Sequence, residues 1–371
     1  MIKELERHPH ARAVLTPALR TQGQPSHAYL FHGPGGSGKR SVARAVAAEL
    51  LADGAPDPDG ARARAASGAH PDLTWVAPSG AHEILVSDID GPVVGAASKT
   101  PFEAARRVFV IERVDELGDE AANRMLKTLE EPAAFVHLIL LTDRLVDVLP
   151  TIRSRCQLVR FDAAPINDVA DELSALGVPH ESALACARLA LGDAERAREL
   201  VGPEGSALRV AAETFARATL AGEAAALRPW DGLLAAVKSR GEGVRAELEG
   251  RKSAELEMYP RKEHKRVQTE WDDRIRRARR RVETSALDLE LQLVALWFAD
   301  VAYLAWDAND LVRNADRSTE LGQDADRSAD PQRLRTAIEL VEETRQRFQL
   351  NVTEDLACEA LAYRLEHALV L

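Results

Sequence analysis

The stretch that decides how the first part of this chain folds is Gly33-Pro34-Gly35-Gly36-Ser37-Gly38-Lys39. It follows the apolar residues 29–31 and precedes a helical pattern over residues 41–51. A glycine-rich turn between a strand and a helix, ending in Gly-Lys, is the setting of a phosphate-binding P-loop. Its backbone N–H groups converge on phosphate oxygens, and the helix N-terminus favours negative charge. We therefore predict a nucleotide site for ATP or ADP, formed by Gly33, Gly35, Gly36, Ser37, Gly38 and Lys39.

The residue after the lysine does not suit a metal site. Magnesium in P-loop sites is held by a hydroxyl group directly after the lysine, and here that position is Arg40. A guanidinium has no lone pair for a cation and repels it. Ser41 comes one residue late, and one residue turns a helical side chain by about 100°. We expect Arg40 and Ser41 at the nucleotide site, with magnesium bound weakly or not at all.

A second motif also argues against magnesium-dependent hydrolysis of ATP. The apolar run 108–111 is followed by Glu112-Arg113-Val114-Asp115, where working P-loop ATPases of this kind carry Asp-Glu. Arg113 stands in place of the carboxylate that activates water, and a guanidinium cannot act as a base at physiological pH. We interpret Glu112, Arg113 and Asp115 as a degenerate acidic motif and expect intrinsic ATP hydrolysis to be weak or absent.

Short apolar runs at 73–76, 138–141 and 157–161 are further strand candidates. Runs that are apolar along their whole length are typical of a parallel sheet buried on both faces. The sequence thus predicts an α/β P-loop module over residues 1–162. Residues 52–70 are rich in Gly, Pro and Ala and are expected to form a surface loop.

Beyond residue 162 the pattern becomes helical. We predict a small helical lid over 163–205 and an all-α domain over 206–371. Apolar residues at 287, 291, 294, 298, 301 and 305 mark one face of a long helix, and 356, 360 and 363 are expected to continue the apolar faces of the bundle. The polar stretch 309–332 is expected to be a loop.

Composition excludes several classes of protein. The net charge of −11 argues against a surface that binds nucleic acid throughout. The three cysteines are widely separated, so there is no ligand set for zinc, and a reduced, cytoplasmic compartment is expected. The N-terminus lacks the apolar core of a signal peptide, and no apolar run is long enough to span a bilayer, so we expect no membrane contact.

Two further motifs carry a resemblance to a known family. Residues 121–132, AANRMLKTLEEP, followed by Ser154-Arg155-Cys156, resemble the clamp-loader family of bacterial DNA polymerase III, an AAA+ family. The stretches 27–31 and His70-Pro71-Asp72 are also similar to that family. Arg40, Arg113 and the Glu112-x-x-Asp115 pattern resemble its delta-prime type rather than the ATP-hydrolysing gamma/tau type. The helical C-terminal part resembles, more loosely, the collar domains of actinobacterial relatives.

The resemblance implies a role in DNA replication, as a hetero-oligomeric component of a polymerase holoenzyme without a polymerase site of its own. It implies gamma/tau and delta subunits as partners, primed DNA within the complex, and the sliding clamp indirectly. Arg155 would then act in trans as an arginine finger on the ATP of a neighbouring subunit, or else form an ordinary salt bridge. Relatives carry four zinc-binding cysteines in the segment aligned with 52–70, and this chain has none there.

For several residues two interpretations stay open. Thr142 resembles a sensor of the γ-phosphate, or it only closes its strand. Arg196 resembles a lid arginine that contacts nucleotide, or it is a solvated helix residue. The basic segment 261–281 either faces DNA or, as we favour, forms the solvated face of a packed helix. For the whole chain, the rival functions are an active AAA+ ATPase and a small-molecule P-loop kinase.

Overall fold

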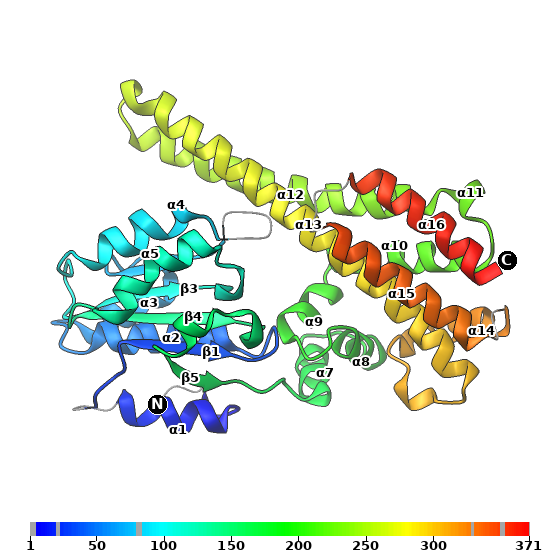
Figure 1. Ribbon diagram of the computed structural model, residues 1–371, viewed down its shortest axis with the longest axis horizontal. Helices are drawn as coiled ribbons and strands as arrows, with labels where there is room; N and C mark the ends of the chain where they lie inside the picture. The colour runs from blue at the N-terminus through cyan, green and yellow to red at the C-terminus, as the bar shows by residue number, and fades with distance from the viewer. Residues whose placement is uncertain (1–4, 20–22, 79–83, 328–329, 349–352, 371) are drawn as a thin grey trace. The chain divides into compact units, whose positions relative to one another are not determined.

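The computed structural model describes residues 5–19, 23–78, 84–327, 330–348 and 353–370 (Figure 1). The chain divides into two compact units, Met1–Ala164 and Pro165–Leu371. The first boundary lies close to the predicted one at residue 162. The predicted border between lid and collar falls inside helix α10 (Pro203–Leu220), and both parts lie in the second unit. The division into lid and collar therefore stays a prediction.

The first unit is built on the predicted parallel sheet. Its five strands are parallel throughout and lie in the order β2-β3-β4-β1-β5. Each predicted run falls within a strand or overlaps one: β1 (Ala28–His32), β2 (Leu73–Val76), β3 (Arg107–Ile111), β4 (Val136–Thr142) and β5 (Gln157–Arg160). The seven residues of β4 are all buried because the central strands are covered on both faces. The α/β fold class is confirmed.

Helices cover the two faces of the sheet through two separate apolar clusters (Figure 1). Alternate residues of one strand serve opposite faces, as Phe31 and Leu30 of β1 show. Phe31 packs with α1 and α2, and Leu30 packs on the face covered by α4, η2 and α5. The helical segments of this unit are α1 (Pro9–Ala18), α2 (Lys39–Ala52), α3 (Pro58–Ser67), α4 (Val86–Ile89), η2 (Asp90–Gly95), η3 (Val114–Glu116), α5 (Asp119–Glu130), η4 (Leu145–Asp147) and α6 (Pro150–Arg153).

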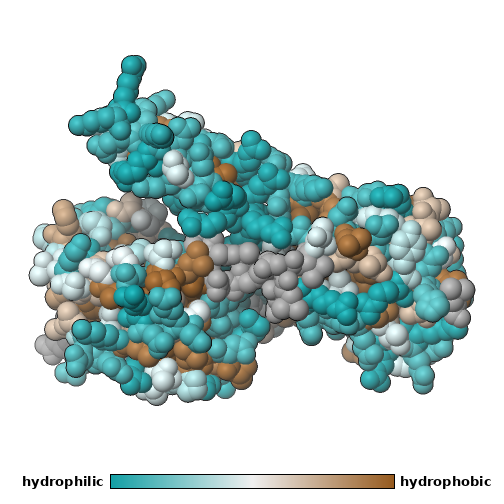
Figure 2. Space-filling view, turned by 45° about the horizontal axis from the view of Figure 1, so that its top comes forward, coloured by the Kyte–Doolittle hydropathy of each residue, from teal (hydrophilic) through white to brown (hydrophobic). Residues whose placement is uncertain are grey.

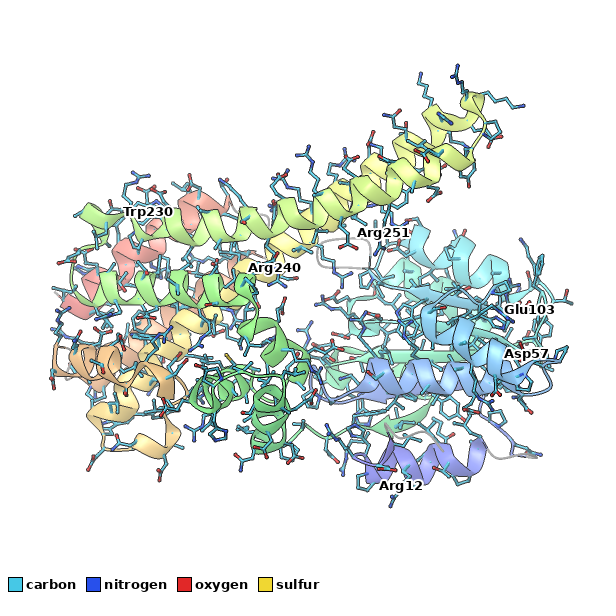
Figure 3. All side chains as sticks on the ribbon, turned by 180° about the vertical axis from the view of Figure 1, so that it is seen from behind. Arg12, Asp57, Glu103, Trp230, Arg240 and Arg251 are labelled. Atoms are coloured by element: carbon cyan, nitrogen blue, oxygen red, sulfur yellow. The ribbon has the colours of Figure 1, made fainter. Side chains whose placement is uncertain are left out.

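The expected surface loop over 52–70 is wrong, because helix α3 occupies most of it. The Asp57 side chain caps the helix by accepting the Gly60 N–H at 3.0 Å, and Pro58 stands in the first turn (Figure 3). Gly68 ends the helix in the left-handed conformation, with φ of 77°. The small buried residues Ala61 and Ala65 let α3 pack closely against α2.

The second unit is helical, as predicted. Its segments are α7 (Ile166–Ala175), α8 (His180–Leu189), α9 (Ala194–Val201), α10, α11 (Ala224–Leu227), α12 (Pro229–Met258), η5 (Arg261–Glu263), α13 (His264–Ala305), η6 (Asn309–Leu311), η7 (Ala315–Arg317), α14 (Ser318–Arg327), α15 (Pro331–Arg347) and α16 (Glu354–Val370). The expected loop over 309–332 is wrong in part, because α14 lies within it. Its Asp324 is buried and accepts the Trp297 indole N–H at 2.9 Å. None of the described helices is both long and apolar enough to cross a membrane.

Helices α12 and α13 form an antiparallel pair whose outer half extends beyond the other helices of this unit (Figure 1). Val267, Trp271 and Ile275 of α13 pack against Leu248 and Leu256 of α12 in a narrow apolar seam. The face of this outer half that Figure 2 shows is mostly hydrophilic. The apolar residues of the basic segment thus pack as predicted, and the choice between a solvated face and one that faces DNA stays a prediction. We call residues 245–280 the arm.

The expected apolar face of the last helix is wrong. The buried residues of α16 include Leu361, Leu365 and Leu369, whereas Leu356 and Tyr363 are 66% and 46% exposed. Both faces of α16 carry apolar residues, so spacing alone could not decide which face the bundle covers.

Candidate functional site

The phosphate loop joins β1 to α2, as the sequence predicts, and its shape depends on glycine. Gly33 has a φ of 149°, and a Cβ atom there would lie 2.1 Å from the Phe161 carbonyl oxygen. Gly38 has a φ of 83° and begins helix α2, which has no side-chain cap at its N-terminus. Only glycine meets both demands without strain. The loop is therefore the kind of cradle that a phosphate group fits.

Lys39 is buried and points back into the loop. Its Nζ donates to the carbonyl oxygens of Gly33 at 2.7 Å and Pro34 at 2.5 Å, and to Ser37 Oγ at 3.2 Å. An ion pair with Asp143, at 2.8 Å, balances its charge. A phosphate that enters the loop has to exchange with these contacts.

The residues in the metal-binding positions contact each other. Arg40 Nε lies 3.0 Å from Glu112 Oε1, and the Trp75 indole N–H donates to the same oxygen at 2.5 Å. A magnesium ion needs oxygen ligands in near-octahedral geometry, and a guanidinium offers none. The residues present therefore do not fit the metal. No group of three or more metal-ligating side chains gathers anywhere in the described part of the chain.

The rest of the acidic motif is also held in pairs. Arg113 adopts a left-handed backbone, with φ of 53°, and its guanidinium pairs with Glu116. Thr142, at the end of β4, donates its hydroxyl hydrogen to Asp115 at 2.7 Å and accepts the Arg144 N–H at 3.0 Å. Thr142 thus ties η3, which follows β3, to the end of β4, and its role as a phosphate sensor stays a prediction.

Arg155 connects the two motifs on which the family resemblance depends. Its Nη2 donates to Glu130 Oε1 at 2.5 Å, and its Nη1 donates to the Thr151 carbonyl oxygen at 2.9 Å. Glu130 belongs to the Leu-Glu-Glu-Pro stretch and Arg155 to Ser-Arg-Cys, and both side chains are partly exposed. The neighbouring Cys156 packs against the apolar cluster on one face of the sheet, and burial raises the pKa of its thiol to about 12.

Ser41 and Arg196 are the two remaining predicted site residues. Ser41 is exposed on α2 and makes no described contact with the loop. Arg196 belongs to the second unit, where its Nη1 donates to Gln292 Oε1 at 2.9 Å. Its proposed contact with nucleotide stays a prediction.

Sequence reasoning missed two residues of the site. Asp143 pairs with Lys39, and Trp75 holds Glu112. The signal for Asp143 was its place at the end of β4, because the carboxyl ends of parallel strands meet at the same side of the sheet as the phosphate loop. Trp75 had no such signal, since its indole reaches Glu112 only when β2 and β3 pair in register.

The chain resembles known proteins mainly over its first unit. A family model described as "DNA polymerase III, delta subunit" matches residues 8–165. The DNA polymerase III subunit delta' of Pseudomonas aeruginosa is 37% identical over 143 residues, which are 37% of this chain and 44% of that protein. The subunit delta' of Bacillus subtilis is 36% identical over 164 residues, 43% of this chain and 49% of that protein. The chain thus spans about half the length of these relatives.

Solved structures are similar at a lower level. A DNA polymerase III gamma subunit-related protein from Thermotoga maritima superposes with a TM-score of 0.45 at 14% identity, over 96% of this chain and 99% of that chain.

Proposed function

We propose that the chain is a delta-prime-like member of the DNA polymerase III clamp-loader family, which it resembles over residues 8–165, and that it acts as an adaptor in a clamp loader. In this role it assembles with gamma/tau-type and delta-type subunits, helps to load the sliding clamp on primed DNA, and offers Arg155 to the ATP of a gamma/tau neighbour.

The position of Arg155, just before strand β5, is the main support for this proposal. In the register of β5 and β1, Gln157 lies beside Tyr29 and Arg160 lies beside His32. Arg155 therefore precedes the start of β5, whereas the phosphate loop follows the end of β1. At about 3.3 Å per residue, the length of β5 puts them roughly 13 Å apart along the strands. Arg155 and the chain's own phosphate loop thus lie at opposite ends of the strands, which supports a role for Arg155 at the ATP of another subunit.

The surroundings of Arg155 also support release to a new partner. Its side chain is 35% exposed and that of Glu130 is 48% exposed. An exposed ion pair of this kind contributes little to stability, so exchange of the carboxylate for a phosphate group costs little. The planar guanidinium suits phosphate oxygens and can stabilise charge on a transferred phosphoryl group.

The chain's own loop supports the adaptor role over the rival active ATPase. Arg40 blocks the metal position, and Arg113 replaces the carboxylate that would activate water and pairs with Glu116. We expect the purified chain to hydrolyse ATP far more slowly than about one turnover per second, a typical enzyme rate.

The test is a reconstituted loader in which Arg155→Ala replaces the natural residue. We expect assembly to be retained and DNA-stimulated ATP hydrolysis to fall at least about tenfold, because arginine fingers contribute strongly to phosphoryl transfer. Arg160→Ala is the matched control, since Arg160 is an exposed arginine paired with Asp162 at 3.3 Å. Assembly is measured separately by size-exclusion chromatography. Unchanged hydrolysis in a fully assembled Arg155→Ala complex would contradict the finger role.

A further inference from the structure

We propose that Arg40 takes the place of magnesium in this site, so that the phosphate loop binds a nucleoside di- or triphosphate without a divalent metal. The proposal depends on the phosphate-loop assignment and not on the partners of the chain. It goes beyond the adaptor role, which makes no statement about how this loop binds its own ligand.

The argument starts from the Arg40–Glu112 pair. In P-loop sites a hydroxyl group after the lysine and a carboxylate at the end of the neighbouring strand hold the metal between them. Here the side chains at these two positions meet directly, at 3.0 Å. The Glu112 side chain is only 10% exposed, and its Oε1 also accepts the Trp75 N–H. The carboxylate is therefore already neutralised by a protein cation, and a metal ion would have to displace it.

The guanidinium can also do what the metal does for phosphate. Its N–H donors lie in a planar fork that matches phosphate oxygens, and its charge persists at any physiological pH. The Arg40 side chain is 55% exposed and begins in the first turn of α2 beside the loop. It can therefore reach a phosphate bound in the loop while Nε keeps its contact with Glu112.

His8, the residue before α1, borders the phosphate loop. The residue is 8% exposed, and the centroid of its ring lies 4.9 Å from that of the Phe161 ring. Its Nε2 would lie 3.3 Å from a Cβ atom on Gly38, so the ring borders the loop. No described protein group forms a hydrogen bond with its Nδ1. The Nε2 edge of the ring therefore forms part of the wall of the loop, whereas Nδ1 is covered by protein atoms.

The test is calorimetric titration of the full chain with ADP, once with EDTA and once with magnesium. We expect the dissociation constants of the natural chain to agree within about twofold, because Arg40 already supplies the cation. Arg40→Thr restores the metal-binding hydroxyl and frees Glu112. Its affinity for ADP should fall at least about tenfold in EDTA and recover when magnesium is added. Arg62→Thr is the matched control, because Arg62 also pairs with a carboxylate, Glu49 at 3.0 Å, but lies on α3.

Two results would overturn the proposal. One is binding by the natural chain that requires magnesium, and the other is no ADP binding under either condition. If Arg40→Thr does not fold, Arg40→Gln tests the same point, because it keeps a long polar side chain and removes the cation. We expect its affinity for ADP in EDTA to fall at least about tenfold, and an affinity equal to that of the natural chain would also contradict the proposal. These titrations use the isolated chain, so they can fail or succeed independently of the reconstituted loader.

Discussion

Replacing Glu290 by glutamine should stabilise the helical unit, by an amount that depends on pH. Glu290 lies on α13 with 0% exposure, and neither carboxyl oxygen has a hydrogen-bond partner among the described residues. The charged group that faces it is Arg240 of α12, which pairs with Glu199 (Figure 3). The thiol of Cys358 on α16 also lies near. Burial raises the pKa of Glu290 to about 9, although the charge of Arg240 lowers it.

The sign and size follow from proton linkage. Between the ordinary pKa of 4.5 and the folded value of about 9, the folded chain holds a proton that the unfolded chain releases. The free energy of unfolding therefore falls as the pH rises through this window. At pH 7, which lies 2.5 pH units above the ordinary pKa of 4.5, the free energy of unfolding is lowered by about 3 kcal/mol, at about 1.4 kcal/mol per pH unit. Glu290→Gln removes this penalty, and the gain stays below that value because the amide still lacks partners.

Urea unfolding followed by circular dichroism at pH 5, 7 and 8.5 measures the effect, with unchanged m-values as a check on the folded state. We expect a small difference at pH 5 and a growing advantage of Glu290→Gln at higher pH. Glu283→Gln is the control, because Glu283 lies on the same helix but pairs with Arg279 at 2.8 Å. A variant destabilised equally at all three pH values would refute the reasoning, since it would mean that the carboxylate is ionised and stabilised by Arg240.

Two further substitutions test the framework of the site and the arm. Asp72→Asn should lower the free energy of unfolding by about 2–3 kcal/mol at pH 7, because the buried carboxylate accepts the N–H groups of residues 102, 103 and 104 at 2.6, 2.9 and 3.0 Å. Burial raises the pKa of the Asp72 carboxyl group, but these hydrogen bonds outweigh burial and leave the pKa lowered. The loss of stability in Asp72→Asn should therefore disappear as the pH falls below 3.8, the ordinary pKa of the group. A loss of stability that persists in acid would contradict this account. Trp271→Ala should cost about 3–5 kcal/mol locally, because the indole is 6% exposed in the narrow seam of the arm. Hydrogen exchange should then accelerate in residues 245–280 and not in the first unit, and uniform acceleration would show that the arm is not a separate cooperative segment.

The centre of the sheet could be predicted from the sequence because its strands carry continuous apolar runs, a pattern that buried parallel strands share. Helix α3 could not be seen in the same way, because alanine, glycine and proline dominate its composition. Its local signals were present all the same: a capping Asp57, Pro58 in the first turn and Gly68 after the last. Composition outweighed these signals in the prediction of a loop.

For the site, motif positions predicted which residues gather but not how they pair. Arg40 was identified as a departure from a metal site and Glu112 as part of a degenerate acidic motif, and their mutual contact depends on how the first turn of α2 meets the end of β3. The exposed face of α16 shows a related limit. A helix with apolar residues all round carries no periodic signal to say which face is covered.

The placement of Arg155 and the phosphate loop at opposite ends of the strands also constrains symmetry. Two patches that face opposite ways cannot both belong to one two-fold interface, in which the same surface meets itself. A contact that brings Arg155 of one subunit to a phosphate loop of the next is therefore heterologous and repeats from head to tail. Such a series closes into a ring or ends in two unlike terminal subunits. On the proposed role of Arg155, a chain that supplies an arginine to a neighbour and needs none at its own loop would suit the terminal position.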